Sequence, residues 1–202
     1  MKKITLIALL FFFQAFNISA NEPKLDQIIN GLDNPWSLTF LNNDRVLITE
    51  KSGNLLLVNL SNKKTQKIKH NLNILEDGQG GLLEVLYYKD QVFVSYTEDR
   101  KKGKTSTSVA KARFNELELN FQNIFRAEPP INSGYHFGSR LAIKDNFIYI
   151  TTGERGEGMI AQDPKKHPGS IIRIHLDGKI PKDNPKFIDK KDWLPEIYQI
   201  GV

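Results

Sequence analysis

Beyond residue 20, apolar positions come in short bursts rich in Val, Ile, Leu, Phe, Tyr and Thr, separated by clusters of Gly, Asn, Asp and Lys. Bursts of this length with turn residues between them are typical of β-strands. No window sustains the apolar repeat of about 3.6 positions that marks a helix, so the pattern predicts an all-β fold. The predicted strands span residues 36–40, 45–50, 54–59, 82–88, 92–96, 108–114, 147–152 and 170–176.

One arrangement of strand, turn and strand occurs three times, each time followed by a further strand. The paired strands are 37–40 with 45–50, 84–88 with 92–98, and 140–143 with 147–152. The copies lie roughly 50 residues apart, which is close to the length of a four-stranded blade in a β-propeller. A β-sandwich also has short strands and frequent turns, and it stays open as an alternative at this point.

Three blades do not close a propeller, because rings of about four to eight blades are usual. The last residues, 197–202, also form a strand-like run with no turn or polar tail behind it. We therefore expect residues 21–202 to be the N-terminal part of a truncated propeller domain.

Residues 1–20 resemble a secretory signal peptide. Lys2 and Lys3 precede an apolar run over residues 4–16, and a short polar stretch ends at Ala20. We expect cleavage near Ala20 and a mature protein in the periplasm or outside the cell. An uncleaved anchor is the alternative, but polar residues interrupt a run that needs about 18 apolar residues to span a bilayer. No membrane insertion is expected after cleavage.

Composition narrows the function classes. The chain has no cysteine, so a packed core rather than disulfides must stabilise it in an oxidising compartment. The formal net charge is +5, to which the two lysines of the predicted signal contribute. Pairs of lysines lie scattered in polar turns, not on one face with interleaved aromatic residues, which argues against a nucleic-acid partner.

The strongest candidate for chemistry is His136, which lies between two glycines in a turn. We read residues 142–150 as a strand, with His136 before it and the carboxylate of Glu154 in a glycine-bearing turn after it. Sheets commonly present reactive side chains on such turns, and a histidine there is a candidate general base. The alternative is a turn histidine with no role beyond its own hydrogen bonds. His70 and His167 are expected to be solvated, and His175 is expected on the outward side of a strand.

Several common site motifs are missing from the sequence. Neither His-x-x-x-His nor Cys-x-x-Cys spacing occurs, no Gly-x-Gly-x-x-Gly opens a helix, and no Gly-x-Ser-x-Gly is present. A second glycine-rich turn, residues 77–83, contains Gln79. This segment is either a flexible loop between blades or a place where the Gln79 amide faces a ligand.

Six short motifs follow one another between residue 29 and residue 202. They are Asn34-Pro35-Trp36, Gly78-Gln79-Gly80-Gly81-Leu82-Leu83, His136-Phe137-Gly138-Ser139-Arg140-Leu141, Gly153-Glu154-Arg155, Ala161-Gln162-Asp163 and residues 177–185. In this order they resemble the soluble quinoprotein sugar dehydrogenases, and within them the periplasmic aldose sugar dehydrogenases that use pyrroloquinoline quinone (PQQ).

The resemblance implies a six-bladed propeller with the quinone on its top face and a calcium ion beneath the quinone carbonyls. It implies that His136 is the base that takes the proton of the sugar's anomeric hydroxyl, and that Glu154 orients this histidine. Gln79 matches a glutamine that borders quinone and substrate, and Gln162 matches a second pocket glutamine. No metal ligand is assigned within these residues.

The chain also departs from the family pattern. Members of the family continue after Gly201 with an Arg-Asn-Pro stretch that holds the quinone. The resemblance also implies that the calcium ligands lie in the missing half. Residues 1–202 alone are therefore expected to be inactive. Glu154 replaces the aspartate of the best-known glucose enzyme, and Tyr135 also differs from that enzyme. Both differences leave the preferred sugar open.

The resemblance therefore implies an enzyme that oxidises an aldose to its lactone by hydride transfer to PQQ and passes electrons to a periplasmic acceptor. A propeller without catalytic activity, which binds a sugar or a partner protein, is the main alternative. A lactone-hydrolase propeller is a further one, but it would need a central metal held by acidic side chains.

Overall fold

The computed structural model describes residues 23–186 and 192–202, and the structural statements below refer to this part of the chain. The predicted signal peptide, residues 1–20, lies outside the described residues. The described chain is all-β apart from one 3-10 helix, η1 (Gly158–Gln162). Within it, no helix has the length and apolar character needed to cross a membrane.

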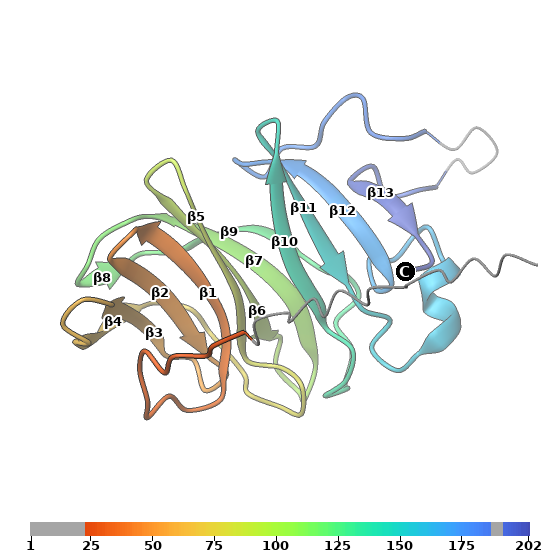
Figure 1. Ribbon diagram of the computed structural model, residues 1–202. Coiled ribbons are helices and arrows are strands. Elements are labelled where there is room, and N and C mark those ends of the chain that lie inside the picture. The colour runs from red at the N-terminus through yellow and green to blue at the C-terminus, as the bar shows by residue number, and fades with distance from the viewer. Residues whose placement is uncertain (1–22, 187–191) are drawn as a thin grey trace, which may run out of the picture.

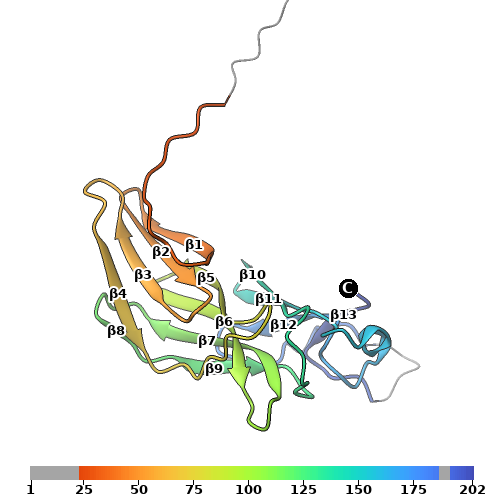
Figure 2. The ribbon, with the colours of Figure 1, turned by 90° about the horizontal axis from the view of Figure 1, so that it is seen from below.

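The strands form three sheets that follow one another in chain order (Figures 1 and 2). We call these sheets blades 1 to 3. Blade 1 contains, in spatial order, β1 (Pro35–Asn42), β2 (Arg45–Glu50), β3 (Leu55–Asn59), β4 (Thr65–His70) and β8 (Glu118–Leu119). Blade 2 contains β5 (Leu82–Tyr88), β6 (Gln91–Asp99), β7 (Thr105–Arg113) and β9 (Gln122–Arg126). Blade 3 contains β10 (Gly138–Lys144), β11 (Phe147–Thr152), β12 (Ser170–His175) and β13 (Ile197–Ile200).

Each blade contains four antiparallel strands that pair in chain order, which is the architecture of a β-propeller. The predicted fold class is confirmed, and each of the three sequence copies corresponds to one blade. The prediction missed β4 and β9, because their sequences, TQKIKH and QNIFR, have few apolar residues and leave most side chains outside the core.

Two-residue turns join the innermost two strands of blades 2 and 3. Lys89 and Asp90 connect β5 to β6, and Asp145 and Asn146 connect β10 to β11. All four have positive φ, between 49° and 64°. Turns with two such residues match the right-handed twist of the strands they join, so they fix the hairpin register.

Blade 2 packs against a neighbouring blade on each of its faces. Along β6, Val92 and Val94 lie in a core shared with blade 1, whereas Phe93 lies in a core shared with blade 3. All three side chains are fully buried. Alternate residues of a strand point to opposite faces, so a strand covered on both sides must be apolar at consecutive positions.

The innermost strands β1, β5 and β10 lie beside one another, and Glu84 on β5 joins them. One of its carboxylate oxygens accepts a hydrogen bond from Ser37 Oγ on β1 at 2.7 Å, and the other accepts from Arg140 Nη1 on β10 at 2.6 Å. The residue is only 8% exposed. Buried charges are retained where they are paired and hydrogen-bonded, and this carboxylate is bonded to both neighbouring blades.

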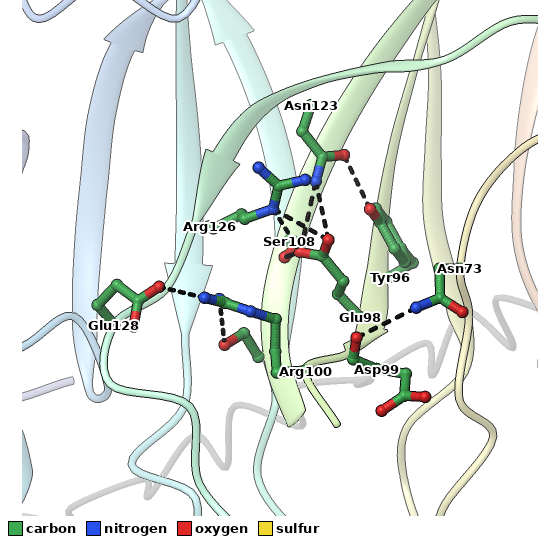
Figure 3. Close-up of polar contacts among 10 residues, drawn as sticks. Asn73, Tyr96, Glu98, Asp99, Arg100, Ser108, Asn123, Arg126 and Glu128 are labelled. Atoms are coloured by element: carbon green, nitrogen blue, oxygen red, sulfur yellow. Dashed lines mark hydrogen bonds and ion pairs between the residues drawn. The ribbon is translucent and has the colours of Figure 1, made fainter. Parts of the chain in front are cut away.

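A second polar cluster holds the outer strand β9 to the rest of blade 2 (Figure 3). Glu98 on β6 accepts hydrogen bonds from Ser108 Oγ on β7 and from Arg126 Nε on β9, each at 2.7 Å. The amide of Asn123 lies between this carboxylate and the Tyr96 hydroxyl. Burial raises the pKa of Tyr96 to about 12. The cluster stabilises the blade, since its members bond mainly to one another.

Residues 116–121 connect blade 2 back to blade 1. β8 lies between β7 and β9 in the sequence, yet it pairs in parallel with β4, the outer strand of blade 1. Beyond this pair, Asn71 Nδ2 donates to the Phe121 carbonyl at 3.1 Å, and the Phe121 N–H donates to Asn71 Oδ1 at 2.8 Å. The outer edge of blade 1 is therefore covered by chain from blade 2.

Glu84→Ala is expected to lower the free energy of unfolding of the complete protein by about 1.5–3 kcal/mol, the usual contribution of hydrogen bonds to a charged group. The Arg140 side chain is 61% exposed, so water can solvate it once Glu84 is gone. Urea denaturation measures the change. The control is Glu116→Ala, which removes the exposed partner of Arg45 and should cost less than about 1 kcal/mol. Equal losses in both variants would contradict the linking role of Glu84.

Candidate active site

Two loops that precede blades 2 and 3 are hydrogen-bonded to each other. The N–H of Gln79 donates to the carbonyl of Gly134 at 2.8 Å, and the N–H of His136 donates to Gln79 Oε1 at 2.9 Å. A Cβ on Gly78 would come within 2.4 Å of the Gly134 oxygen, so only glycine permits this approach. Gln79 and His136 are thus held next to each other by backbone contacts.

The β10–β11 hairpin brings His136 and Glu154 together. Gly138 pairs with Thr152 at the open end of the hairpin, so residues just outside both strands face each other. The structure has two strands here, as the third sequence copy predicts with 140–143 and 147–152. The interpretation of residues 142–150 as one strand is wrong, because Asp145 and Asn146 turn the chain there. At about 3.3 Å per residue, a continuous strand would have kept the two side chains at opposite ends.

The side chains of His136 and Glu154 form a hydrogen bond between Nδ1 and Oε1. An ionised carboxylate only accepts hydrogen bonds, so Nδ1 carries the proton of this bond, and in the neutral imidazole the lone pair lies on Nε2. The His136 side chain is 52% exposed and that of Glu154 is 26% exposed. In its neutral form the exposed imidazole therefore has Nε2 as its proton acceptor, which is the geometry of a general base.

The environment of Glu154 keeps it ionised. Partial burial by itself would raise the pKa of this carboxyl group, but hydrogen bonds from the His136 ring and the backbone outweigh burial and hold the pKa below its ordinary value. One of these bonds comes from the N–H of Gly156, at 3.2 Å. A carboxylate that stays charged fixes the histidine tautomer and favours the imidazolium that forms when the base takes a proton.

The backbone around His136 adopts a conformation that side chains rarely allow. The φ angles of His136, Gly138 and Ser139 are +49°, +67° and +70°. For a residue with a Cβ this costs roughly 1–2 kcal/mol and requires support from its surroundings. Part of that support is close packing: a Cβ on Gly153 would lie 1.9 Å from the His136 carbonyl oxygen.

Arg155 is a buried residue of this site to which the sequence assigned no role. Its exposed fraction is 4%, and its guanidinium carbon lies 3.7 Å from the centre of the Phe137 ring. Burial lowers the pKa of Arg155 to about 10, and the nearby charge of Asp77 partly offsets this effect. An arginine in a polar, glycine-rich turn resembles a solvated residue, and the signal that the sequence offered was its membership of the motif Gly153-Glu154-Arg155.

Gln162 lies apart from the three residues joined by hydrogen bonds. It is the last residue of η1 and is exposed. Its amide nitrogen lies 2.8 Å from the place that a Cβ on Gly201 would occupy. Among the described residues, the hydrogen bonds bring Gln79, His136 and Glu154 together, whereas Gln162 lies next to the chain that follows β13.

The other histidines have structural surroundings. His167, expected to be solvated, is 4% exposed, so that expectation is wrong. Its Nδ1 accepts from the N–H of Glu128 at 2.8 Å, and its Nε2 donates to Glu196 at 2.9 Å. Its lysine and proline neighbours suggested a surface turn, but the segment folds back over Phe125, 5.1 Å away between ring centres. This second histidine–glutamate pair is closed off from solvent, unlike His136–Glu154.

His70 and His175 also differ in part from expectation. His70 ends β4 instead of lying in a turn, and its Nε2 bonds to the Gly53 carbonyl at 2.7 Å. His175 ends β12 and is half-buried, with its ring 4.8 Å from that of Phe147. Among residues 23–186 and 192–202, His136 is the histidine that combines an exposed ring with a bonded carboxylate.

The fold and these loops together define a β-propeller with an oriented histidine, an exposed amide and a supporting carboxylate at one end of its blades. A model of the Glucose / Sorbosone dehydrogenase family matches residues 32–202. The chain belongs to this family, which confirms the resemblance drawn from the six motifs.

Individual relatives agree with this assignment. The chain is 33% identical over 181 residues to the aldose sugar dehydrogenase YliI of Escherichia coli (strain K12), covering 85% of this chain and 48% of the relative. It is 25% identical over 209 residues to quinoprotein glucose dehydrogenase B of Acinetobacter calcoaceticus, covering 86% and 43%. A crystal structure of a glucose dehydrogenase superposes with a TM-score of 0.81 at 33% identity, covering 87% of this chain and 54% of that one. The chain thus spans about half the length of the relatives it matches.

Glu154→Gln is expected to destabilise the protein at pH 5 and to have less effect in stronger acid. A carboxyl group whose pKa is lowered by folding contributes stability above its unfolded pKa of about 4.3, and this contribution is lost as the pH falls through the lowered value. Urea denaturation of both proteins between pH 5 and pH 2.5 measures the difference. Glu157→Gln, an exposed glutamate in the same loop, is the control. A difference that does not shrink in acid would contradict the assignment.

Gly153→Ala is expected to push the loop of Gly153 away from the loop of His136, since the alanine Cβ would lie 1.9 Å from the His136 carbonyl oxygen. We expect a loss of stability of about 1–3 kcal/mol, as for other overpacked sites, and a change in the side-chain NMR signals of His136. The control is Gly31→Ala: the space around Gly31 is open but its φ is +75°, so alanine should cost about 1–2 kcal/mol of stability and leave the His136 signals unchanged. An unchanged His136 spectrum in Gly153→Ala would show that the contact is not needed.

Proposed function

We propose that the complete protein is a PQQ-dependent aldose sugar dehydrogenase that produces a lactone, with His136 as the general base. The observation that carries the proposal is the His136–Glu154 pair, in which the carboxylate takes the Nδ1 hydrogen bond and the half-exposed ring keeps Nε2 for a substrate proton. Membership of the family and the similarity to a protein named an aldose sugar dehydrogenase support the substrate class. The similarity to a protein named a quinoprotein glucose dehydrogenase supports the quinone.

In the proposed reaction the anomeric carbon of the sugar loses a hydride and its hydroxyl group loses a proton, so that this carbon–oxygen bond becomes the lactone carbonyl. His136 Nε2 accepts the proton. Glu154 keeps the ring in the required tautomer and stabilises the imidazolium that results. Removal of the proton as the hydride departs avoids a positively charged sugar product.

Gln79 is proposed to contact the quinone and the sugar through the NH₂ of its side-chain amide. Its Oε1 accepts the N–H of His136, so the Nε2 hydrogens remain as donors. Gln162 is proposed as a second amide of the pocket. The exposed position of Gln162 and its place beside Gly201 agree with this role, because the Arg-Asn-Pro stretch that the family resemblance implies follows that glycine.

The donor set of the described site fits a quinone of this type. Amide N–H groups match the carbonyl and carboxylate oxygens that PQQ carries. When bound, PQQ supplies the two-electron acceptor for the hydride. A calcium ion is also proposed. Within the described residues no group of three or more His, Cys, Asp or Glu side chains could hold a metal ion, and we propose that its ligands belong to the rest of the protein.

The location and the electron acceptor are part of the same proposal. The signal-like residues 1–20 support export to the periplasm or beyond. A periplasmic acceptor would then reoxidise the cofactor after each turnover. We propose no nucleic-acid partner and no membrane insertion of the mature protein.

The complete protein, reconstituted with PQQ and calcium, is expected to reduce an artificial dye when aldoses are added. His136→Ala should lower kcat by at least about a hundredfold, because general bases contribute that much or more. The matched control is His175→Ala, which removes a half-buried histidine from the end of β12 and should leave kcat within about threefold.

Each alternative outcome has a distinct meaning. Full activity in His136→Ala would overturn its assignment as the base. Quinone binding without dye reduction by any aldose would show that the substrate is not an aldose. Absence of quinone binding would favour a propeller without catalytic activity that binds a sugar or a partner protein.

A further inference from the structure

The guanidinium of Arg155 is bonded to the loop that carries His136. Its Nε donates to the Tyr135 carbonyl at 2.9 Å, and Nη2 donates to the Ser133 carbonyl. It also bonds Thr105 on β7, through Nη2 to Oγ1 at 2.7 Å and through Nη1 to the carbonyl at 3.3 Å. Four of its five N–H hydrogens thus have neutral oxygen acceptors.

Arg155 contacts both chain neighbours of His136, one through its backbone and the other through its ring. Tyr135, whose carbonyl accepts from Nε, precedes the histidine, and Phe137, whose ring lies under the guanidinium, follows it. The planar, rigid guanidinium therefore sets the position of both neighbours at once. This arrangement explains how His136 retains a φ of +49° despite the strain.

Arg155 also connects this loop to the carboxylate that bonds the imidazole. Glu154 and Arg155 are consecutive residues of one turn, so the same turn presents a carboxylate to the His136 ring and a guanidinium to the Tyr135 carbonyl just before His136. A shift of Arg155 would move the ring relative to its partner. No carboxylate in the described residues forms an ion pair with Arg155, so its charge is balanced only at longer range.

We propose that Arg155 is a positioning residue for His136: it holds the loop so that Nδ1 meets Glu154 and Nε2 remains free. The expected effect of Arg155 on turnover rests on the proposed function. Its geometric content, the tautomer and placement of the imidazole, does not depend on the reaction.

Arg173 offers a matched control. It is also buried, at 7% exposed, and it stacks on an aromatic ring, with its guanidinium carbon 3.9 Å from the centre of the Phe147 ring. Its partners, Asn184 and Asp183, lie away from the His136 loop. Loss of either arginine removes a buried, stacked cation, but only Arg155 contacts the neighbours of His136.

The test combines histidine NMR with kinetics on the complete protein. In ¹⁵N-histidine-labelled protein without cofactor, Arg155→Met should shift His136 from the Nδ1–H form towards the tautomer mixture of a free histidine side chain. With PQQ and calcium, the same variant should lose about 10- to 100-fold in kcat with less than about threefold change in KM, the effect of a misplaced catalytic group. Arg173→Met should lower the melting temperature but leave the His136 spectrum and kcat unchanged.

Two further variants keep the test decisive. Arg155→Lys keeps the charge but not the planar fork, so it should behave like Arg155→Met. Thr105→Val removes one acceptor with little change of shape and should shift the tautomer in the same direction to a smaller extent, even if Arg155→Met does not fold.

The outcomes separate this proposal from the proposed function. A wild-type tautomer in Arg155→Met, or full restoration by Arg155→Lys, would overturn the positioning role, whatever the enzyme does. A shifted tautomer in a protein that oxidises no aldose would support the positioning role and refute the dehydrogenase.

Discussion

The carboxylate of Glu84 is bonded to side chains from the blades on either side of its own, and the rest of the architecture depends on the geometry it helps to fix. The angle between neighbouring blades decides where the loops at their ends meet. In this chain the meeting point of those loops is the candidate site. Apolar packing on both faces of blade 2 provides most of the stability, whereas the directional bonds of Glu84 select one arrangement of the inner strands.

The site itself is built from loops that hold one another. Gln79 is bonded to the backbone of His136, Glu154 to its ring, and Arg155 to the residues around it. Two histidine–glutamate pairs illustrate how environment decides the role: the pair of His167 is closed off and serves packing, whereas His136 is half exposed and keeps a free nitrogen.

The sequence predicted the fold well where strands are buried on both faces, because consecutive apolar residues as in β6 leave little ambiguity. It missed β4 and β9, whose partners determine their conformation more than their own residues do. His136, Glu154 and Gln79 were found through their motifs. Their contact depends on the turn at Asp145 and Asn146, and the burial of Arg155 and His167 depends on segments distant in sequence.

The pairing of β8 with β4 has a consequence for the order of assembly. A ribosome releases the N-terminus first, so all four of the consecutive strands of blade 1 are available before blade 2 exists. The outer edge of blade 1 nevertheless gains its last neighbour only when residues 118 and 119 arrive, after the whole of β7 has been made. Until then β4 remains an open edge that another nascent chain can pair with. Blade 1 is therefore completed by β8 only after most of blade 2 has been synthesised.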